Sequence, residues 1–110
     1  MAGWFELSKS SNDQFRFVLK AGNGEIILTS ELYTTRAAAE KGIASVRVNS
    51  PLDAHYEKKT ATNGKFHFNL KAGNHQVIGT SQLYATEQSR DKGIASVKTN
   101  GASETVKDNT

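Results

Sequence analysis

An internal repeat constrains this chain more than any other feature of its sequence. The segment Gly42–Val46 (GIASV) returns unchanged as Gly93–Val97, 51 residues later. The same shift places Leu19–Asn23 (LKAGN) on Leu70–Asn74 without a gap. Roughly half of the aligned positions are identical, which indicates a duplicated structural unit.

The two repeats are expected to share one hydrophobic core. We divide the chain into residues 1–53 and residues 54–110, and a unit of this size is too small to form a stable core alone. One domain with pseudo-twofold symmetry is therefore predicted. Two copies in one chain also favour a monomer, because exchange between the units can be completed internally.

Composition excludes several kinds of chemistry. The chain has no cysteine, which rules out disulfides, thiolate metal sites and cysteine nucleophiles and favours a reducing compartment, so we expect a cytoplasmic protein. The amino terminus lacks the apolar run of a secretory signal, and no segment approaches the roughly 20 apolar residues of a membrane span. The net charge of +3 raises nucleic acid only slightly as a partner.

Alternation of apolar and polar residues predicts three strands in the first repeat. They cover Trp4–Lys9, Phe15–Lys20 and Glu25–Thr29. The first turn is the polar segment Ser10–Asp13, and the second contains Gly22–Gly24, whose residue types tolerate positive φ. The second repeat is predicted to follow the same pattern.

A helix is predicted after the third strand of each repeat. Thr35 and Thr86 are plausible N-caps for helices over Arg36–Val48 and Glu87–Thr99. Apolar residues recur at three- and four-residue spacing, which predicts one buried face on each helix. Its members are Ala39, Ile43 and Val46 in the first helix and Ile94 and Val97 in the second, where Arg90 replaces Ala39.

The cost of burying charge decides which face of the sheet is buried. One face of the first strand presents Phe5 and Leu7, and the other presents Glu6. Burying an unpaired glutamate costs several kcal/mol, whereas burying Phe or Leu gains roughly 1.5–3 kcal/mol each. We therefore expect Phe5 and Leu7 inside, and Glu6 and its counterpart Glu57 on an open, charged outer face.

The chain also resembles a known family. The residues that carry the resemblance are Phe5–Glu6, Phe15–Phe17, Leu19–Glu25, Tyr33 and Gly42–Val46. They are similar to the YegP-like family of small bacterial proteins, whose members carry one or two copies of a domain of unknown function. The resemblance extends over essentially the whole chain and includes the tandem arrangement. It brings no established activity, cofactor or catalytic residue.

The resemblance implies an α+β fold. Its expected unit is β-β-β-α-β, present twice and merged into one antiparallel sheet with two helices packed on one face and exchanged terminal strands. The sequence agrees, because Tyr56-Glu57 lies 51 residues after Phe5-Glu6, and a strand is predicted over His55–Lys59. The tail Glu104–Lys107 lies near the next such step and is also predicted to be a strand.

Basic side chains on the predicted outer face form the first candidate binding surface. They are Arg16, Lys20, His67 and Lys71. A basic antiparallel sheet can hold a nucleic-acid backbone, but base-reading sheets also need exposed aromatic rings, and only Trp4 remains for that role. Glu6 and Glu57 lie on the same face and could pair with these cations instead.

Tyr33 and Tyr84 form the second candidate, at equivalent positions before the two helices. Each ring can pack against the helix start, or it can border a pocket. Gly42 and Gly93 cost about 1 kcal/mol each relative to alanine in a helix, which predicts a close approach to both helices. We expect the sheet or the other helix there, with a ligand across the helix–helix contact as the alternative.

The remaining candidate residues give little support for a metal site, a phosphate site or a catalytic site. His55, His67 and His75 lack the close spacing and the carboxylate of a zinc site and are interpreted as surface residues. Gly22–Gly24 joins two strands and opens no helix, so it is interpreted as a hairpin turn rather than a phosphate loop. No metal, no cofactor and no catalytic residue is predicted.

Three functions stay open on these grounds. The leading hypothesis is a small soluble binding or interaction module without catalysis, with an unknown protein partner. The alternative is weak, non-specific nucleic-acid binding through the outer sheet face. The third is a small enzyme with a pocket near Tyr33 and Tyr84. No membrane partner is expected.

Overall fold

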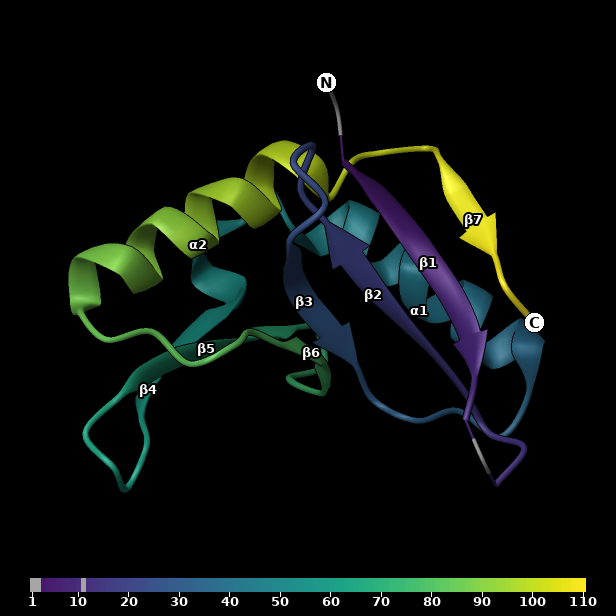
Figure 1. Ribbon diagram of the computed structural model, residues 1–110, viewed down its shortest axis with the longest axis horizontal. Helices are drawn as coiled ribbons and strands as arrows, with labels where there is room; N and C mark the ends of the chain where they lie inside the picture. The colour runs from purple at the N-terminus through teal and green to yellow at the C-terminus, as the bar shows by residue number, and fades with distance from the viewer. Residues whose placement is uncertain (1–2, 11) are drawn as a thin grey trace.

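Two β-β-β-α units follow one another along the chain, and a short C-terminal strand follows the second (Figure 1). The computed structural model describes residues 3–10 and 12–110, so Met1, Ala2 and Ser11, which belong to the predicted first repeat, lie outside the described residues. The elements are β1 (Trp4–Lys9), β2 (Phe15–Lys20), β3 (Ile26–Ser30), α1 (Arg36–Asn49), the 3-10 turn η1 (Asp53–His55), β4 (Tyr56–Thr60), β5 (Phe66–Lys71), β6 (Val77–Thr80), α2 (Glu87–Asn100) and β7 (Val106–Asp108).

The predicted elements are present, with small shifts at their ends. Each helix begins at the predicted residue and extends one residue further. The strands β3 and β4 begin and end one residue later than predicted, and β7 begins two residues later.

All seven strands form one sheet in the order β4-β5-β6-β3-β2-β1-β7. The strands β3 and β6 join the two repeats at its centre, where Thr29 pairs with Thr80 and Ser30 with Gly79. The sheet twists strongly, so the two repeats are seen at different angles in Figure 1. The prediction of one sheet built from two merged repeats is confirmed.

The terminal strand β7 runs parallel to its neighbour β1, whereas the other described pairs are antiparallel. The helix α2 ends beside the start of β1, where Asn100 Oδ1 accepts a hydrogen bond from Gly3 N at 2.8 Å. From there the chain runs along β1 in the same direction and places Val106 opposite Phe5. The expected exchange of terminal strands is present, but the expectation of a wholly antiparallel sheet needs this one correction.

The core lies between the two helices and one face of the sheet. Phe5 and Leu7 are buried there, so the predicted register of the first strand is confirmed. The helix α1 contacts β2 and β6, and α2 contacts β5 and β3, so each helix packs on both repeats. The buried apolar residues are Phe5, Leu7, Phe17, Leu19, Ile27, Leu28, Ala39, Ile43, Val46, Phe68, Leu70, Ile78, Ile94 and Val97.

Both helices begin at the caps that the sequence predicts. Thr35 Oγ1 accepts a hydrogen bond from Ala38 N at 3.1 Å, and Thr86 Oγ1 accepts one from Ser89 N at 3.0 Å. Each bond satisfies a backbone N–H that has no partner within its helix. Neither of the two described helices is long and apolar enough to cross a membrane.

The two repeats differ where β3 and β6 meet. Leu28 of β3 is buried, and its counterpart in β6 is Gly79. A Cβ atom on Gly79 would lie 2.7 Å from Leu28 Cγ, which is closer than carbon atoms approach. One leucine therefore fills the space that two equivalent side chains would otherwise share.

Candidate functional site

The outer face of the sheet carries ion pairs at equivalent positions of the two repeats. Lys20 Nζ lies 3.0 Å from Glu6 Oε2, and Lys71 Nζ lies 2.9 Å from Glu57 Oε2. The hydrogen bond from the Trp4 indole, followed by that from Lys20, lowers the pKa of Glu6, and the hydrogen bond from Lys71 lowers the pKa of Glu57. Two of the four candidate cations therefore have an acidic neighbour within the sheet.

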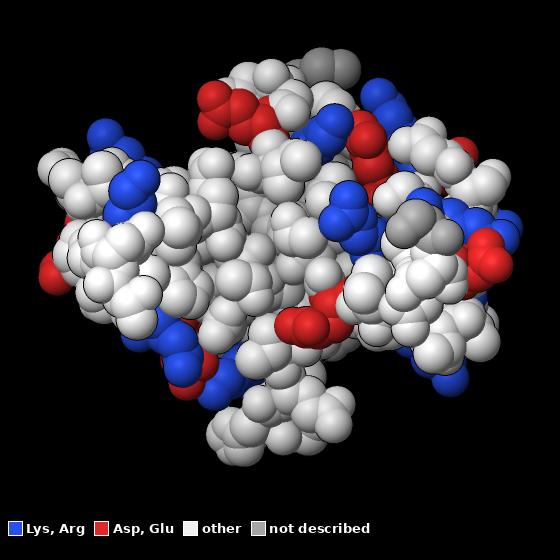
Figure 2. Space-filling view, turned by 60° about the horizontal axis from the view of Figure 1, so that its bottom comes forward, with Lys and Arg blue, Asp and Glu red and all other residues white. Residues whose placement is uncertain are grey.

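Arg16 and His67 lie apart from these pairs. Arg16 is exposed on β2 opposite Ser8, and His67 is half-buried on β5 opposite Lys59. Figure 2 shows basic and acidic side chains interspersed around an uncharged centre, without a continuous basic patch on the side it views. Nucleic-acid binding through this face stays a prediction.

Trp4 is partly covered and is not an open platform for stacking. Its indole N–H donates to Glu6 Oε2 at 2.8 Å. The ammonium of Lys107, which belongs to β7, lies 4.3 Å from the ring centroid. A cation of the terminal strand thus occupies the aromatic face that a base would need.

Tyr33 and Tyr84 pack against the helices at equivalent positions. Their rings stack on Phe17 and Phe68 at centroid distances of 6.2 and 6.5 Å. A Cβ atom on Gly42 would lie 2.5 Å from Tyr33 Oη and 2.9 Å from Phe17 Cε2. The close approach that the helix glycines predict is therefore made by the tyrosine ring and, in α1, also by the sheet. Burial raises the pKa of Tyr33.

A hollow of about 200 Å³ lies beside Tyr84, between α2 and the β2–β3 hairpin. Glu25 and Lys92 are among the residues that line it. A general base must lie within hydrogen-bond reach of the group it activates, and none of the described residues that line the hollow forms a hydrogen bond with the Tyr84 hydroxyl. The enzyme hypothesis for Tyr33 and Tyr84 stays a prediction without a catalytic pair to support it.

The histidines are placed separately. His55 Nδ1 lies 2.6 Å from Asn49 Oδ1, His67 is half-buried, and His75 is exposed. The interpretation as surface residues is therefore accurate for His75 and incomplete for the other two. Within residues 3–10 and 12–110, no group of three metal-ligating side chains lies close enough together to hold an ion.

Sequence reasoning missed two grooves between the sheet edges and the helices. The first has a volume of about 440 Å³, and we call it the β7 groove; it is lined by Leu7, Arg36, Glu40, Ile43, Arg47, Val106 and Asp108. The second has a volume of about 290 Å³, and we call it the β4 groove; it is lined by Asp53, Tyr56, Lys58, Asp91, Ile94, Ala95 and Lys98.

The grooves occupy equivalent places in the two repeats. Shifted by 51 residues, Leu7, Glu40, Ile43 and Arg47 of the β7 groove become Lys58, Asp91, Ile94 and Lys98 of the β4 groove. The helix side of each groove keeps an isoleucine, but the strand side changes from leucine to lysine. Because of this lysine, apolar patterns in the sequence do not reveal the second groove.

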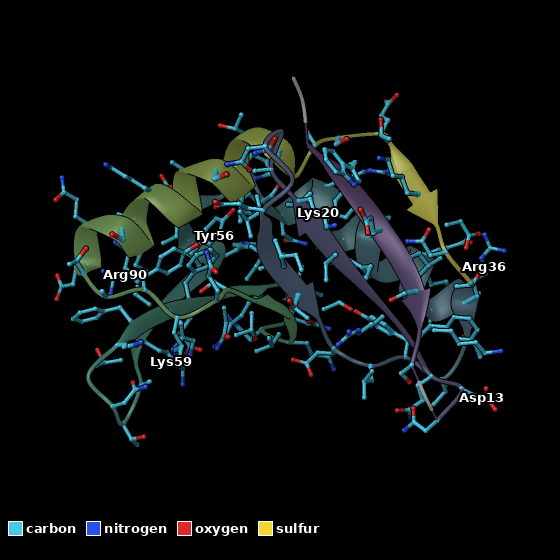
Figure 3. All side chains as sticks on the ribbon, in the orientation of Figure 1. Asp13, Lys20, Arg36, Tyr56, Lys59 and Arg90 are labelled. Carbon is cyan, nitrogen blue, oxygen red and sulfur yellow. The ribbon has the colours of Figure 1, made fainter. Side chains whose placement is uncertain are left out.

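The terminal strand β7 covers the β1 edge of the sheet and forms one wall of the β7 groove. Phe5 N donates to Thr105 O at 3.0 Å, and Asn109 N donates to Leu7 O at 2.8 Å. Arg36 of α1 forms an ion pair with Asp108, and Figure 3 shows its side chain beside the end of β7. Backbone pairing and a charged contact to the helix therefore hold β7 in place.

The equivalent edge of the sheet, β4, presents free backbone groups. Phe68 uses both of its backbone groups on Ser81, the residue after β6, because its N–H donates to Ser81 Oγ at 3.0 Å and its carbonyl accepts from Ser81 N at 2.9 Å. Lys58 is the β4 residue opposite Phe68. In such an antiparallel pair neither residue bonds the other, so the N–H and C=O of Lys58 point away from β5 toward the edge.

Comparison with known proteins places the chain in a family. The family described as a domain of unknown function (DUF1508) matches residues 10–57 and again residues 61–108. The UPF0339 protein YegP of Escherichia coli (strain K12) is 78% identical over 110 residues, which is 100% of both chains. A UPF0339 protein of Shewanella oneidensis is 64% identical over 108 residues, 98% of each chain.

Solved structures agree with the fold. The solution NMR structure of YegP from E. coli has a TM-score of 0.95 at 78% identity and covers 100% of this chain and 95% of its own. The solution NMR structure of the Shewanella oneidensis protein SO3888 has a TM-score of 0.93 at 64% identity and covers 98% of this chain and 92% of its own.

The chain belongs to the DUF1508 family and carries two copies of its domain in one α+β fold. It is similar along its full length to YegP, whose structure is described as that of a protein of unknown function. The predicted membership of the YegP-like family is confirmed, and no activity comes with it. The family match uses the same 51-residue step between its two units as the sequence repeat.

Proposed function

We propose that this protein is a small, non-catalytic interaction module that binds an extended segment of a partner protein along β4. The observation that carries the proposal is the pair of equivalent edges. The strand β1 holds β7, whereas β4 has a described strand neighbour on one side only, β5. An exposed strand edge is a template for strand addition, and the groove beside it can receive side chains of the added segment.

We also propose that the protein acts as a monomer in the cytoplasm. Lys58 and Lys59 are both exposed on β4. Pairing β4 with β4 of a second copy would bring these lysines together, and like charges across strands are unfavourable. The partner strand of β4 is therefore expected to come from a different protein.

The composition of the chain supports the proposed location. It contains no cysteine, which fits a reducing compartment such as the cytoplasm.

A selection from displayed short random peptides tests the module. We expect selected peptides to shift the backbone amide resonances of Tyr56–Thr60 in the wild-type protein. Lys58→Pro removes the outward N–H and should weaken binding strongly. Proline is tolerated where an edge N–H faces solvent, so the variant should keep its fold. Lys58→Ala is the matched control, because it keeps the N–H and should still bind.

Two results would contradict the proposal. One is a shift map of the wild-type protein in which selected peptides perturb the outer face or β1 and leave β4 unchanged. The other is a folded Lys58→Pro variant that binds as tightly as the wild type. If Lys58→Pro does not fold, the wild-type shift map alone decides.

A further inference from the structure

The pairing of β7 with β1 shows how an added strand lies beside a groove of this fold, and a cluster of charges around Lys58 shows what β4 would select. Resting on the proposed function, we infer that β4 binds an extended segment of another protein that runs parallel to it. The segment carries an apolar residue opposite Tyr56 and, two residues later, an aspartate or glutamate opposite Lys58.

The first repeat supplies the direction and the register. In the parallel pair of β1 and β7, Val106 lies opposite Phe5 and Asp108 lies opposite Leu7. Val106, Asp108 and Leu7 all line the β7 groove. Opposite residues of the two strands therefore face the same groove, and two positions of the added strand, two residues apart, contribute to it.

The same two positions exist beside β4. The counterparts of Phe5 and Leu7 are Tyr56 and Lys58, and both line the β4 groove. The N–H of Tyr56 donates to Asp53 O within the chain, whereas the N–H and C=O of Lys58 point to the edge. The backbone bonds of an added segment are therefore expected to centre on Lys58, which places the opposite residue beside the lysine side chain.

In the β7 groove, a cation of the helix joins the added strand. Arg36 forms an ion pair with Asp108 of β7, and its Nε lies 3.1 Å from Glu40 Oε1, one turn along α1. One guanidinium thus lies between a carboxylate of the helix and a carboxylate of the added strand. The counterpart of Arg36 in α2 is Glu87, which is not part of the β4 groove lining.

In the β4 groove, the corresponding cation belongs to the strand. Lys58 Nζ lies 3.3 Å from Asp91 Oδ1, and Arg90 Nη2 lies 3.3 Å from the same oxygen. Two cations therefore share one carboxylate, which leaves the cluster with an excess of positive charge. The other lysine of the groove lining, Lys98, is ion-paired with Asp53. An acidic residue opposite Lys58 would balance the cluster, whereas a basic one would face a like charge.

The position two residues earlier meets apolar groups. It lies opposite Tyr56, whose ring packs on Phe68 at a centroid distance of 5.6 Å. Ile94 and Ala95 of α2 also line this groove. In β7 the equivalent position holds Val106. An apolar residue is therefore expected there.

The tail of a second copy has the same pattern, but the tail is already bound within its own chain. Val106–Asp108 carries the apolar and the acidic residue at the required spacing. This segment is held on β1, because Asn109 N donates to Leu7 O at 2.8 Å and Arg36 pairs with Asp108. A different protein with this pattern is therefore the expected occupant of β4, and the tail sequence is a suitable probe.

Three peptides that differ at single positions test the selection. The probes are capped peptides with the sequence of residues 103–110, either native or with Asp108→Asn or Val106→Ser. We expect the native peptide to bind about two- to fivefold more tightly than the Asp108→Asn peptide, because an exposed charge pair contributes modestly. This difference should shrink at high salt. The Val106→Ser peptide should also bind more weakly than the native one.

NMR spectra of the wild-type protein locate the peptide and give its direction. Amide shifts should fall on β4 and on the side of α2 that lines the β4 groove. A nitroxide label on the amino end of the peptide should broaden the resonances of Tyr56 more than those of Thr60, because the two strands run in the same direction.

Charge reversal on the protein provides the matched comparison. Lys58→Glu should reverse the order of the native and Asp108→Asn peptides, and Lys58→Ala should abolish their difference while binding persists. Lys59→Glu makes the same change of net charge as Lys58→Glu at the next residue of β4. Lys59 is not part of the β4 groove lining, so its variant should leave the order unchanged.

The outcomes separate this inference from the proposed function. Equal binding of the native and Asp108→Asn peptides at β4, unchanged by Lys58→Glu, overturns the acid selection and leaves strand addition intact. Stronger broadening at Thr60 overturns the parallel direction. Shifts on β1 instead of β4 overturn the inference, because the peptide then displaces β7. Self-association with β4 shifts in the absence of peptide overturns it as well, because a second copy is then the occupant. Failure of the random-peptide selection at β4 overturns the proposed function itself.

Discussion

His75 adopts a backbone conformation that favours glycine. Its φ is 67°, and its counterpart in the first repeat, Gly24, has a φ of 86°. The two hairpin turns therefore have the same backbone shape, although only one of them has the residue best suited to it. A side chain in this left-handed region costs about 1–2 kcal/mol, and glycine avoids most of that cost.

We predict that His75→Gly stabilises the protein by about 0.5–1 kcal/mol, because the cost of the left-handed conformation disappears and the imidazole that is lost is exposed. Urea denaturation measures the change in the free energy of unfolding. The reciprocal variant Gly24→His should destabilise by a similar amount. Two changes of the same sign would mean that the turns differ in more than residue type.

At the level of the elements, each helix is positioned by a tyrosine that lies against a glycine. A Cβ atom on Gly93 would lie 2.7 Å from Tyr84 Cζ, as one on Gly42 would lie close to the Tyr33 ring. The glycines lower the intrinsic helix propensity, but they leave room for the tyrosine ring to pack between the helix and the sheet. The sequence predicts the close approach, whereas the identity of the approaching group follows only from the path of the chain before each helix.

We predict that Gly93→Ala destabilises the protein by about 1–2 kcal/mol, because overpacking outweighs a gain of about 1 kcal/mol in helix propensity. Thermal or urea unfolding measures it. In a Tyr84→Ala background the same change should stabilise, since only the propensity remains. Gly73→Ala is the control, with no atom within 4 Å of the added Cβ, and should be nearly neutral. A destabilising effect that persists without the tyrosine ring would refute this explanation.

For the whole molecule, paired carboxylates on several elements link stability to pH. The pKa values of Glu6, Glu57, Asp91 and Asp108 are all lowered, chiefly by hydrogen bonds from neighbouring side chains. A pKa that is lower in the folded state stabilises the fold above the unfolded value. That stability is lost as the pH falls through the folded pKa.

We predict that Glu6→Gln combined with Glu57→Gln lowers stability at neutral pH and flattens its loss between about pH 5 and pH 3. Urea denaturation across this pH range measures both effects. Glu104→Gln, which changes an exposed carboxylate of the loop before β7, is the control and should keep the wild-type slope. An unchanged slope in the double variant would show that the outer-face pairs do not contribute.

Local sequence patterns predict most of the fold. The features that they do not predict depend on contacts between segments that are far apart in the sequence. Alternation around Phe5 and Leu7 predicts the buried face, and Thr35 and Thr86 predict the helix starts. The direction of β7 depends on where α2 ends relative to β1, which no local pattern records. The candidate site was missed for a similar reason: Lys58 carries an ordinary surface charge, and its free backbone is visible only once its partner strand is known.

Because Leu28 of the first half packs against Gly79 of the second half, the two halves of the chain cannot replace one another. A protein assembled from two first halves would force a pair of leucines into room for one, and a protein assembled from two second halves would leave a void at the centre of the sheet. The different residues at this pair of positions therefore favour packing of a first half against a second half, and the core disfavours packing of two like halves.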